Sequence, residues 1–440
     1  MSMRYVSLDR IRGLKALRRS PTPEMHPLGW PASCREDGGE SDSPTKMIRP
    51  DPERLCQVLG GTPKTNQYGE YLAVRCWCAQ PARYVPDLRA LRLLMADASD
   101  EIADPEQWLF LDTETTGLAG GSGTYAFLVG IAWWEGGGLE IEQFFLREYS
   151  EERSLLSALK DRIAERPVLV TFNGKSFDWP LLETRYRMSR QISVPTPRAH
   201  LDFLHPARNL WRLRLGSVRL SELERHVLGW DRGVDLLSGL IPQIYFDYLR
   251  GGPPERLIPV LNHNQMDLRG LAALSTRILS LLSDAETVGQ DGLELFGVSR
   301  ICEKRGEHGR ARKLCEKSIA SVLPTETDRA ARRSLARLAK REGDFDLACN
   351  LWKDALGNSR HGYEAYEQLA IYYEHKSRDP EQARKIVRQA LDELRRAIQT
   401  GALTPAAYRE LRAKFDLRMK RLERKTRRPL LDVLTIQSPA

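Results

Sequence analysis

Short apolar runs separated by polar turns form the clearest pattern in the middle of the chain. The runs span residues 108–112, 125–134, 139–146 and 168–172. Each has the length and the bounding turns that are typical of a buried strand. Glu135-Gly-Gly-Gly separates the second run from the third, which predicts a hairpin. We therefore expect a sheet that starts as a three-stranded meander.

Helical patterns alternate with the later strands. A helix is predicted over 151–165, before the run at 168–172, and a second helix starts near Asp178. Pro180 fits there because the first turn of a helix tolerates proline. A meander followed by alternating helices and strands predicts an α/β fold with a mixed sheet flanked by helices.

From residue 292 onward the pattern is helical and repetitive. Ala311, Ala348 and Ala383 occupy matched positions at spacings of 37 and 35 residues, and periods of this length are typical of stacked helix pairs. The small residue at the helix crossing resembles a tetratricopeptide array, although no repeat has the complete motif. We therefore expect an all-α, tetratricopeptide-like helical repeat domain, closed by a capping helix over 404–425.

Composition suggests where the parts of the chain begin and end. The first 50 residues are dense in Pro, Gly, Ser and charge, as linkers are. The predicted parts are a disordered or linker-like extension at 1–50, an accessory segment at 51–107, the α/β domain at 108–285, the helical repeats at 292–425 and a tail at 426–440.

Composition also excludes several classes of protein. Hydrophobic residues make up 41% of the 440 residues, and no apolar run approaches the roughly 20 residues of a membrane span. The seven cysteines are an odd, scattered set, so we expect no disulfide framework and a cytoplasmic location. Cys56, Cys76 and Cys78 have no nearby histidine to complete a zinc site, so buried packing is the favoured interpretation. A net charge of +8 favours a polyanionic partner without identifying one.

Two acidic residues at the end of the first strand are the strongest chemical candidates. Asp112 and Glu114 are two residues apart, so a strand projects both from the same face. Two carboxylates side by side repel each other unless a cation lies between them, and their hard oxygens suit Mg²⁺ or Mn²⁺. The alternative, an exposed strand face with unrelated acids, fits poorly with the apolar residues before Asp112.

Two further motifs are weaker when taken alone. Asp178 opens a helix after the turn Phe172-Asn-Gly-Lys, where it could reach a metal-bound water or merely cap the helix. His263 and Asp267 are four residues apart on a helix predicted to start at His263, so they share a face. A lone histidine at such a position is often structural.

Together the three motifs resemble the DEDD exonuclease superfamily, histidine subtype, which has a ribonuclease H-like fold. The runs LDTETTGLAGGSGTYAFLVGI, FNGKSFDWPLLETRY, HLDFLHPARNLWR and HNQMDLRGLAAL are similar to the YprB-like predicted exonuclease family, some members of which carry helical repeats. The resemblance covers residues 52–285. The run FNGKSFDWP is also similar to the proofreading domain of family B DNA polymerases, whose third motif normally has tyrosine where this chain has His263.

The resemblance implies roles for the site residues. Asp112, Glu114, Asp178 and Asp267 would bind two Mg²⁺ or Mn²⁺ ions, and His263 would act as the general base. The implied reaction is hydrolysis of phosphodiester bonds from the 3′ end of single-stranded DNA or RNA.

Contacts to nucleic acid are predicted beside these residues. The candidates are Thr115, Asn173, Arg208, Trp211 and Arg212. Asn173 is expected to shape its turn rather than to react. The basic stretch with its aromatic residue is typical of a groove for a nucleic-acid backbone, although a solvated helix face explains it equally well. Nucleic-acid binding and a solvated helix also account equally for the segment 412–428, which has nine basic and two acidic residues.

Two alternative functions stay open. One is a scaffold with a vestigial nuclease fold, whose helical repeats recruit a protein partner. Suitable residue types at all five catalytic positions argue against this scaffold. The other is a structure-selective endonuclease, which would share the fold and the two metals.

Overall fold

The computed structural model describes residues 51–434, except residue 82, residues 118–122, residue 234, residue 290 and residues 357–361. The predicted linker-like extension at 1–50 lies outside the described residues. In the predicted tail at 426–440, the backbone is described as far as Leu434, and the side chains are not described.

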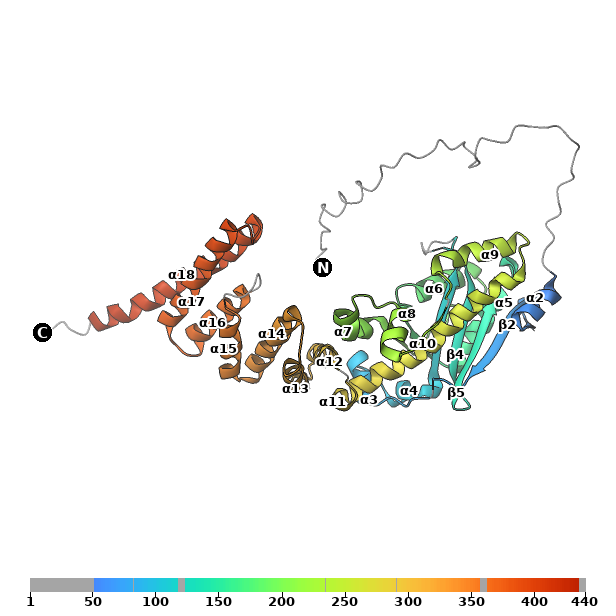
Figure 1. The fold of residues 1–440 in the computed structure, drawn as a ribbon, viewed down its shortest axis with the longest axis horizontal. Helices are drawn as coiled ribbons and strands as arrows, with labels where there is room; N and C mark the ends of the chain where they lie inside the picture. Colours follow the sequence, from blue (N-terminus) through green and yellow to red (C-terminus); the bar gives the residue numbers. More distant parts are fainter. Residues whose placement is uncertain are drawn as a thin grey trace, which may run out of the picture. The chain divides into compact units, whose positions relative to one another are not determined.

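Seven strands of the described chain form one sheet, in the order β1-β2-β5-β4-β3-β6-β7. Their bounds are β1 (Gly61–Asn66), β2 (Gly69–Cys78), β3 (Trp108–Thr115), β4 (Ala126–Glu135), β5 (Gly138–Phe145), β6 (Val168–Thr171) and β7 (Ala199–Asp202). Figure 1 labels the neighbouring strands β2, β5 and β4 of this sheet. The neighbours from β1 to β3 are antiparallel, whereas β3, β6 and β7 are parallel. The mixed sheet predicted from the sequence is confirmed.

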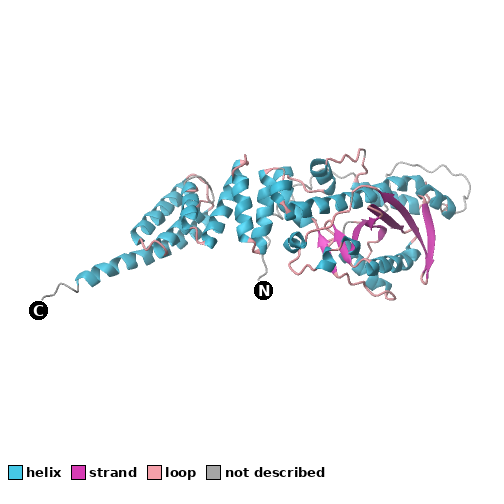
Figure 2. Ribbon diagram, turned by 90° about the horizontal axis from the view of Figure 1, so that it is seen from below, coloured by secondary structure: helices cyan, strands magenta, loops and turns pink. Residues whose placement is uncertain are grey.

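Side chains alternate along β3 between two cores. Trp108 and Phe110 lie in the core on one face of the sheet, and Leu109 and Leu111 lie in the core on the other. The first core includes α3 (Leu88–Leu94), α7 (Leu204–Leu215) and α10 (Ile258–Ser283), and the second includes α5 (Glu152–Glu165), α6 (Asp178–Ser189) and α9 (Ile241–Leu249). Figure 2 shows the strands with helices on both sides, as the sequence predicts for an α/β fold.

Helix α10 begins earlier than expected. The sequence predicts a start at His263, whereas the helix runs from Ile258. Pro259 occupies the first turn, where the missing N–H of proline breaks no helical hydrogen bond. Consequently, His263 and Asp267 both lie inside the helix, about one turn apart on the same face.

Further helices follow α10 and alternate with short turns. They are α12 (Gly292–Arg305), α13 (His308–Ile319), α14 (Thr325–Glu342), α15 (Phe345–Asp354), α16 (Tyr363–His375), α17 (Pro380–Gln399) and α18 (Pro405–Leu434). Ala311, Ala348 and Ala383 are fully buried on α13, α15 and α17, the second helices of successive pairs. The predicted all-α region is confirmed, and its tetratricopeptide-like character stays a prediction.

Short α-helices occur before and between these elements, together with 3₁₀ or π turns at Pro105–Gln107, Tyr149–Glu151, Glu224–Leu228, Ser238–Leu240 and Pro254–Leu257. The short α-helices are α2 (Pro52–Leu59), α4 (Asp100–Ala103), α8 (Leu220–Leu223) and α11 (Ala285–Val288). Across the described ranges, none of the helices combines the length and the apolar content that crossing a membrane requires.

Candidate active site

The carboxyl end of β3 positions the two acidic residues of the strongest motif. Asp112 and Glu114 follow the alternation of the strand and project on the face that α10 covers. From α10, the Asn264 side-chain amide donates a hydrogen bond to Asp112 Oδ2 over 2.8 Å. Gly130 pairs with Asp112 across the sheet, and a Cβ at this glycine would lie 2.0 Å from Asn264 Oδ1. The glycine therefore allows α10 to approach the acidic end of β3.

Asp178 reaches the same region from the start of α6. The Thr113 hydroxyl donates to Asp178 Oδ1 over 2.5 Å, which links the helix to β3. Asp202, at the end of β7, accepts hydrogen bonds from the backbone N–H groups of Asn173 and Lys175 at 2.9 and 3.0 Å. Asn173 has a left-handed backbone, with φ 73°, which asparagine tolerates better than most residues. Asn173 thus shapes the turn that precedes α6 and positions Asp178 at the start of that helix.

His263 makes the most informative contacts. Its Nδ1 lies 2.7 Å from Asp235 Oδ1. Because an ionised carboxylate only accepts hydrogen bonds, Nδ1 holds a proton, and in the neutral form of the ring Nε2 carries the lone pair. Nε2 lies 3.6 Å from Asp267 Oδ2 and 4.0 Å from Glu114 Oε1. The basic nitrogen of His263 therefore faces the acidic residues of the site.

An arginine that is almost fully buried forms ion pairs beside His263. Arg232 forms ion pairs with Glu224, Asp235 and Asp267, and its own side chain is 8% exposed. Glu224 fits beside α10 because Gly270 has no side chain; a Cβ there would lie 1.6 Å from Glu224 Oε1. Arg232 thereby holds one oxygen of Asp267 and keeps Asp235 in place.

Reasoning from the sequence misses Glu224, Arg232 and Asp235. Asp235 lies 28 residues from His263, and Arg232 lies 35 residues from Asp267, so no short spacing links the partners. The sequence does offer a local indication of a charged loop, because the segment WDRGVD has three charged residues around a glycine.

The acidic residues repel one another. Burial, together with the charges of Asp267, Asp178 and Glu114, raises the pKa of Asp112 well above its usual range. Burial also raises the pKa of Glu114 to about 8 and that of Asp178 to about 6. A divalent cation among these oxygens would remove the repulsion, so the donor set fits Mg²⁺ or Mn²⁺.

The carboxylates are turned toward protein partners rather than toward a common point. Asp112, Asp178 and Asp267 each accept a hydrogen bond from a neighbouring Asn, Thr or Arg side chain. Accordingly, no three His, Cys, Asp or Glu side chains within the described ranges are arranged as metal ligands. A cation would have to draw the oxygens together by side-chain rotation.

We expect the protein to lose stability as the pH rises when divalent cations are removed. A carboxyl group whose pKa is higher in the folded state binds more protons when folded, so the free energy of unfolding falls between its unfolded and folded pKa values. For Glu114 this window runs from 4.5 to about 8, and the loss is about 1.4 kcal/mol per pH unit at most. Urea unfolding in EDTA across this window measures the slope.

Two comparisons isolate this effect. Glu114→Gln should flatten the slope, whereas Glu410→Gln, at a site 71% exposed, should leave it unchanged. Adding Mg²⁺ should restore the most stability at the alkaline end, where the carboxylates are ionised. An unchanged slope in Glu114→Gln would contradict the assignment of the pH dependence to this cluster.

His263 lines a cleft of about 940 Å³. Asn173 and Arg208 line it too, so two of the residues predicted to contact nucleic acid lie beside the catalytic candidates. Thr115 is buried, and its hydroxyl donates to the Gly117 carbonyl oxygen over 3.0 Å. This hydrogen bond stabilises the turn at the end of β3.

The structure contradicts the prediction that Trp211 contacts nucleic acid. The indole is fully buried, and its Nε1–H donates to Glu294 Oε1 on α12 over 2.7 Å. A ring in this position cannot stack on a base. Arg212 is exposed on α7 but is not among the described residues that line the cleft. Of the three predicted contacts on α7, Arg208, Trp211 and Arg212, Arg208 alone lines the cleft.

The basic segment of α18 is partly neutralised inside the protein. Arg418, Arg421 and Lys425 all form ion pairs with Glu374 of α16, whose side chain is fully buried. Although burial opposes its charge, hydrogen bonds from Arg421 and Lys425 lower the pKa of Glu374 to about 2. This use of three cations favours a packed capping helix over a nucleic-acid surface.

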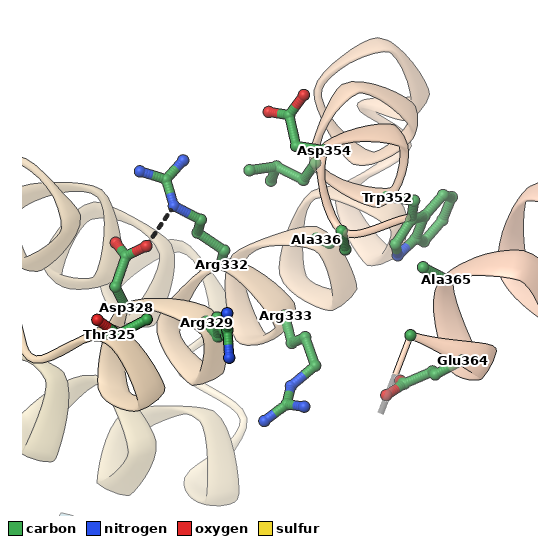
Figure 3. A pocket seen from close by; sticks show the side chains of 13 residues that line it. Thr325, Asp328, Arg329, Arg332, Arg333, Ala336, Trp352, Asp354, Glu364 and Ala365 are labelled. Carbon is green, nitrogen blue, oxygen red and sulfur yellow. Dashed lines mark hydrogen bonds and ion pairs between the residues drawn. The ribbon is translucent and has the colours of Figure 1, made fainter. Parts of the chain in front are cut away.

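A second hollow, of about 240 Å³, lies in the helical region. Figure 3 shows Arg329, Arg332 and Arg333 of α14 around it, with Trp352 of α15 on another side. Arg332 is paired with Asp328 at 2.8 Å. The lining therefore mixes basic, acidic and apolar groups.

Comparisons with known proteins agree with this geometry. Residues 109–279 match the RNase_H superfamily. The YprB protein of Bacillus subtilis (strain 168), described as uncharacterized, is 31% identical over 287 residues, which span 64% of this chain and 69% of that protein. A ribonuclease H-like fold suggests hydrolysis of nucleic acid, and nucleases with this fold generally use divalent metal ions. The chain therefore belongs to the YprB family and contains a domain of the RNase_H superfamily.

Proposed function

We propose that this protein is a metal-dependent 3′→5′ exonuclease of the DEDD superfamily, histidine subtype, which hydrolyses single-stranded DNA or RNA. The observation that supports it most is the orientation of His263, with Nδ1 on Asp235 and Nε2 toward Glu114 and Asp267. In the neutral form of the ring, Nε2 is positioned to accept a proton while Asp235 holds the proton on Nδ1. The 3′→5′ direction rests on the resemblance of the motifs.

The four acidic residues would hold the metal ions. Asp112, Glu114, Asp178 and Asp267 supply hard oxygen donors and no competing thiolates, which suits two Mg²⁺ or Mn²⁺ ions. Such ions stabilise charge on the attacking and leaving oxygens of a phosphodiester.

His263 would supply the base. Nε2 accepts a proton from the attacking water, and the imidazole becomes positively charged. Asp235 holds the Nδ1 proton and stabilises that charge, as an orienting carboxylate does for a catalytic histidine. Arg232 fixes Asp235 and one oxygen of Asp267, so that the base and its acidic neighbour keep their spacing.

The depth of the site supports a single-stranded substrate. The side chains of His263, Glu114 and Asp267 are 8, 13 and 19% exposed. A single strand is flexible, so its terminal phosphodiester can enter the cleft and reach these partly buried side chains. A duplex would first have to unpair and unstack its terminal base pairs, which costs free energy that a single strand does not pay.

The test is incubation of the purified chain with end-labelled single-stranded DNA and RNA in Mg²⁺, Mn²⁺ or EDTA. The proposal expects products that shorten stepwise from the 3′ end with metal and not in EDTA. Internal cuts would favour the structure-selective endonuclease. Tight binding without cleavage in either metal would favour the scaffold, whose protein partner would then be sought at the helical repeats.

We expect Asp235→Asn to lower kcat about tenfold to a hundredfold. Asparagine has no negative charge to stabilise the imidazolium, and its amide can turn a donor toward Nδ1. Steady-state kinetics on a labelled single strand measures the loss, which should appear in kcat more than in KM.

A neighbouring aspartate provides the control for Asp235. Asp231 lies in the same loop, is exposed, and accepts a hydrogen bond from the Gly233 N–H. Asp231 also lines the cleft but makes no hydrogen bond to His263, so Asp231→Asn should leave kcat unchanged, and any effect of the lost charge on substrate binding should appear in KM. A normal kcat in Asp235→Asn would show that His263 needs no orienting partner, and thermal unfolding of both variants identifies any misfolding.

A further inference from the structure

Three arginines line the cleft that contains His263. Arg208 of α7, Arg219 before α8 and Arg225 after α8 all line the cleft and are exposed. Within the described residues, none of the three forms an ion pair with a carboxylate, whereas Arg214, between them in the chain, pairs with acids of α12 and its N-cap. The three guanidinium groups are therefore available to an anion from solution.

Two acidic residues that line the cleft outside the catalytic centre already have partners. Glu222 lies 3.4 Å from a ring nitrogen of His226, and Asp231 accepts a hydrogen bond from Gly233 at 3.0 Å. The catalytic centre, by contrast, gathers four carboxylates that repel one another. A polyanion approaching that centre needs cations along its path to offset this repulsion.

We propose that Arg208, Arg219 and Arg225 bind successive phosphates of a single strand and lead its end to His263. This inference rests on the proposed function and adds the path that the substrate takes. Guanidinium groups bind phosphates with paired donors and obtain no sequence information from them. The strand is therefore held by its backbone, and binding is independent of base sequence.

The test is binding of a fluorescent single-stranded oligonucleotide to the full chain in EDTA, where cleavage does not interfere. A triple variant, with Arg208, Arg219 and Arg225 each changed to Gln, is compared with the wild type over a range of salt concentrations. Each lost phosphate contact lowers the slope of log affinity against log salt by about 0.7, so the triple variant should lose about 2. At low salt its affinity should fall about tenfold or more.

Arg212→Gln is the matched control. Arg212 lies one turn beyond Arg208 on α7 and is exposed outside the cleft, so its replacement should leave both the slope and the affinity unchanged. Because all four arginines are exposed, thermal unfolding should be the same for every variant.

The outcomes separate the path from the proposed activity. An unchanged slope in the triple variant, or an equal loss in Arg212→Gln, would overturn the path. If binding depends on the three arginines but neither Mg²⁺ nor Mn²⁺ supports cleavage, the result would support phosphate binding by these arginines and refute the proposed nuclease activity. If the protein cleaves the strand but its binding does not depend on the three arginines, the result would refute phosphate binding by these arginines and leave the proposed nuclease activity supported.

Discussion

Replacing Asp112 by asparagine is expected to reduce cleavage about a thousandfold or more. Burial and the charges of Asp267, Asp178 and Glu114 all raise the pKa of Asp112, so a cation bound at Asp112 would also offset the charge of its acidic neighbours. Loss of the Asp112 charge removes several kcal/mol of stabilisation from a metal-assisted transition state. Asparagine has nearly the same shape and still accepts the hydrogen bond from Asn264.

The same substitution should stabilise the protein in EDTA. Most replacements of buried residues destabilise a fold, but Asp112→Asn removes one of several charges that repel each other. We therefore expect a higher melting temperature than in the wild type, together with unchanged binding to a single-stranded oligonucleotide. These two results would separate loss of chemistry from loss of structure.

Asp161→Asn is the control for this substitution. Asp161 is exposed on α5, so its replacement should change neither cleavage nor melting temperature. Cleavage at the wild-type rate by Asp112→Asn would refute the carboxylate site. A lower melting temperature with lost binding would show instead that Asp112 supports the fold.

Local spacing explains why much of the fold and the acidic site could be predicted. The alternation of β3 places Asp112 and Glu114 on one face, and the helical period places His263 and Asp267 on one face, because each pair lies within a single element. The burial of Ala311, Ala348 and Ala383 on α13, α15 and α17 follows from the same kind of regularity.

The charged partners of the site could not be predicted in this way. Arg232 and Asp235 belong to a loop, and their contacts reach 35 and 28 residues along the chain to α10. Only the fold brings that loop against the helix. Tertiary contacts of this kind leave no periodicity in the sequence.

Trp211 shows a different source of error. Composition groups it with Arg208 and Arg212, whereas the helix buries Trp211 and exposes the two arginines. Leu204, Ala207 and Trp211 are buried on one side of α7, and the two arginines are exposed on another. A helix face is therefore a better guide to a binding surface than a basic stretch of sequence.

His263→Ala is expected to lower kcat by about a hundredfold to ten-thousandfold at neutral pH, the usual contribution of a general base. KM should change little, because His263 is only 8% exposed and lies deep in the cleft. Single-turnover cleavage of a labelled strand measures the chemical step directly. Free imidazole added to His263→Ala should restore part of the activity, since it can occupy the space beside Asp235.

A second histidine tests whether the effect belongs to the base. Burial lowers the pKa of His200 to about 4, and its Nε2 lies 2.9 Å from Thr171 Oγ1, so this ring stays neutral and supports the fold at β6 and β7. His200→Gln should lower the melting temperature, keep kcat within about a factor of three, and gain nothing from imidazole. If His263→Ala behaved in the same way, His263 would be structural, and the proton of the attacking water would have to pass to solvent or to one of the carboxylates.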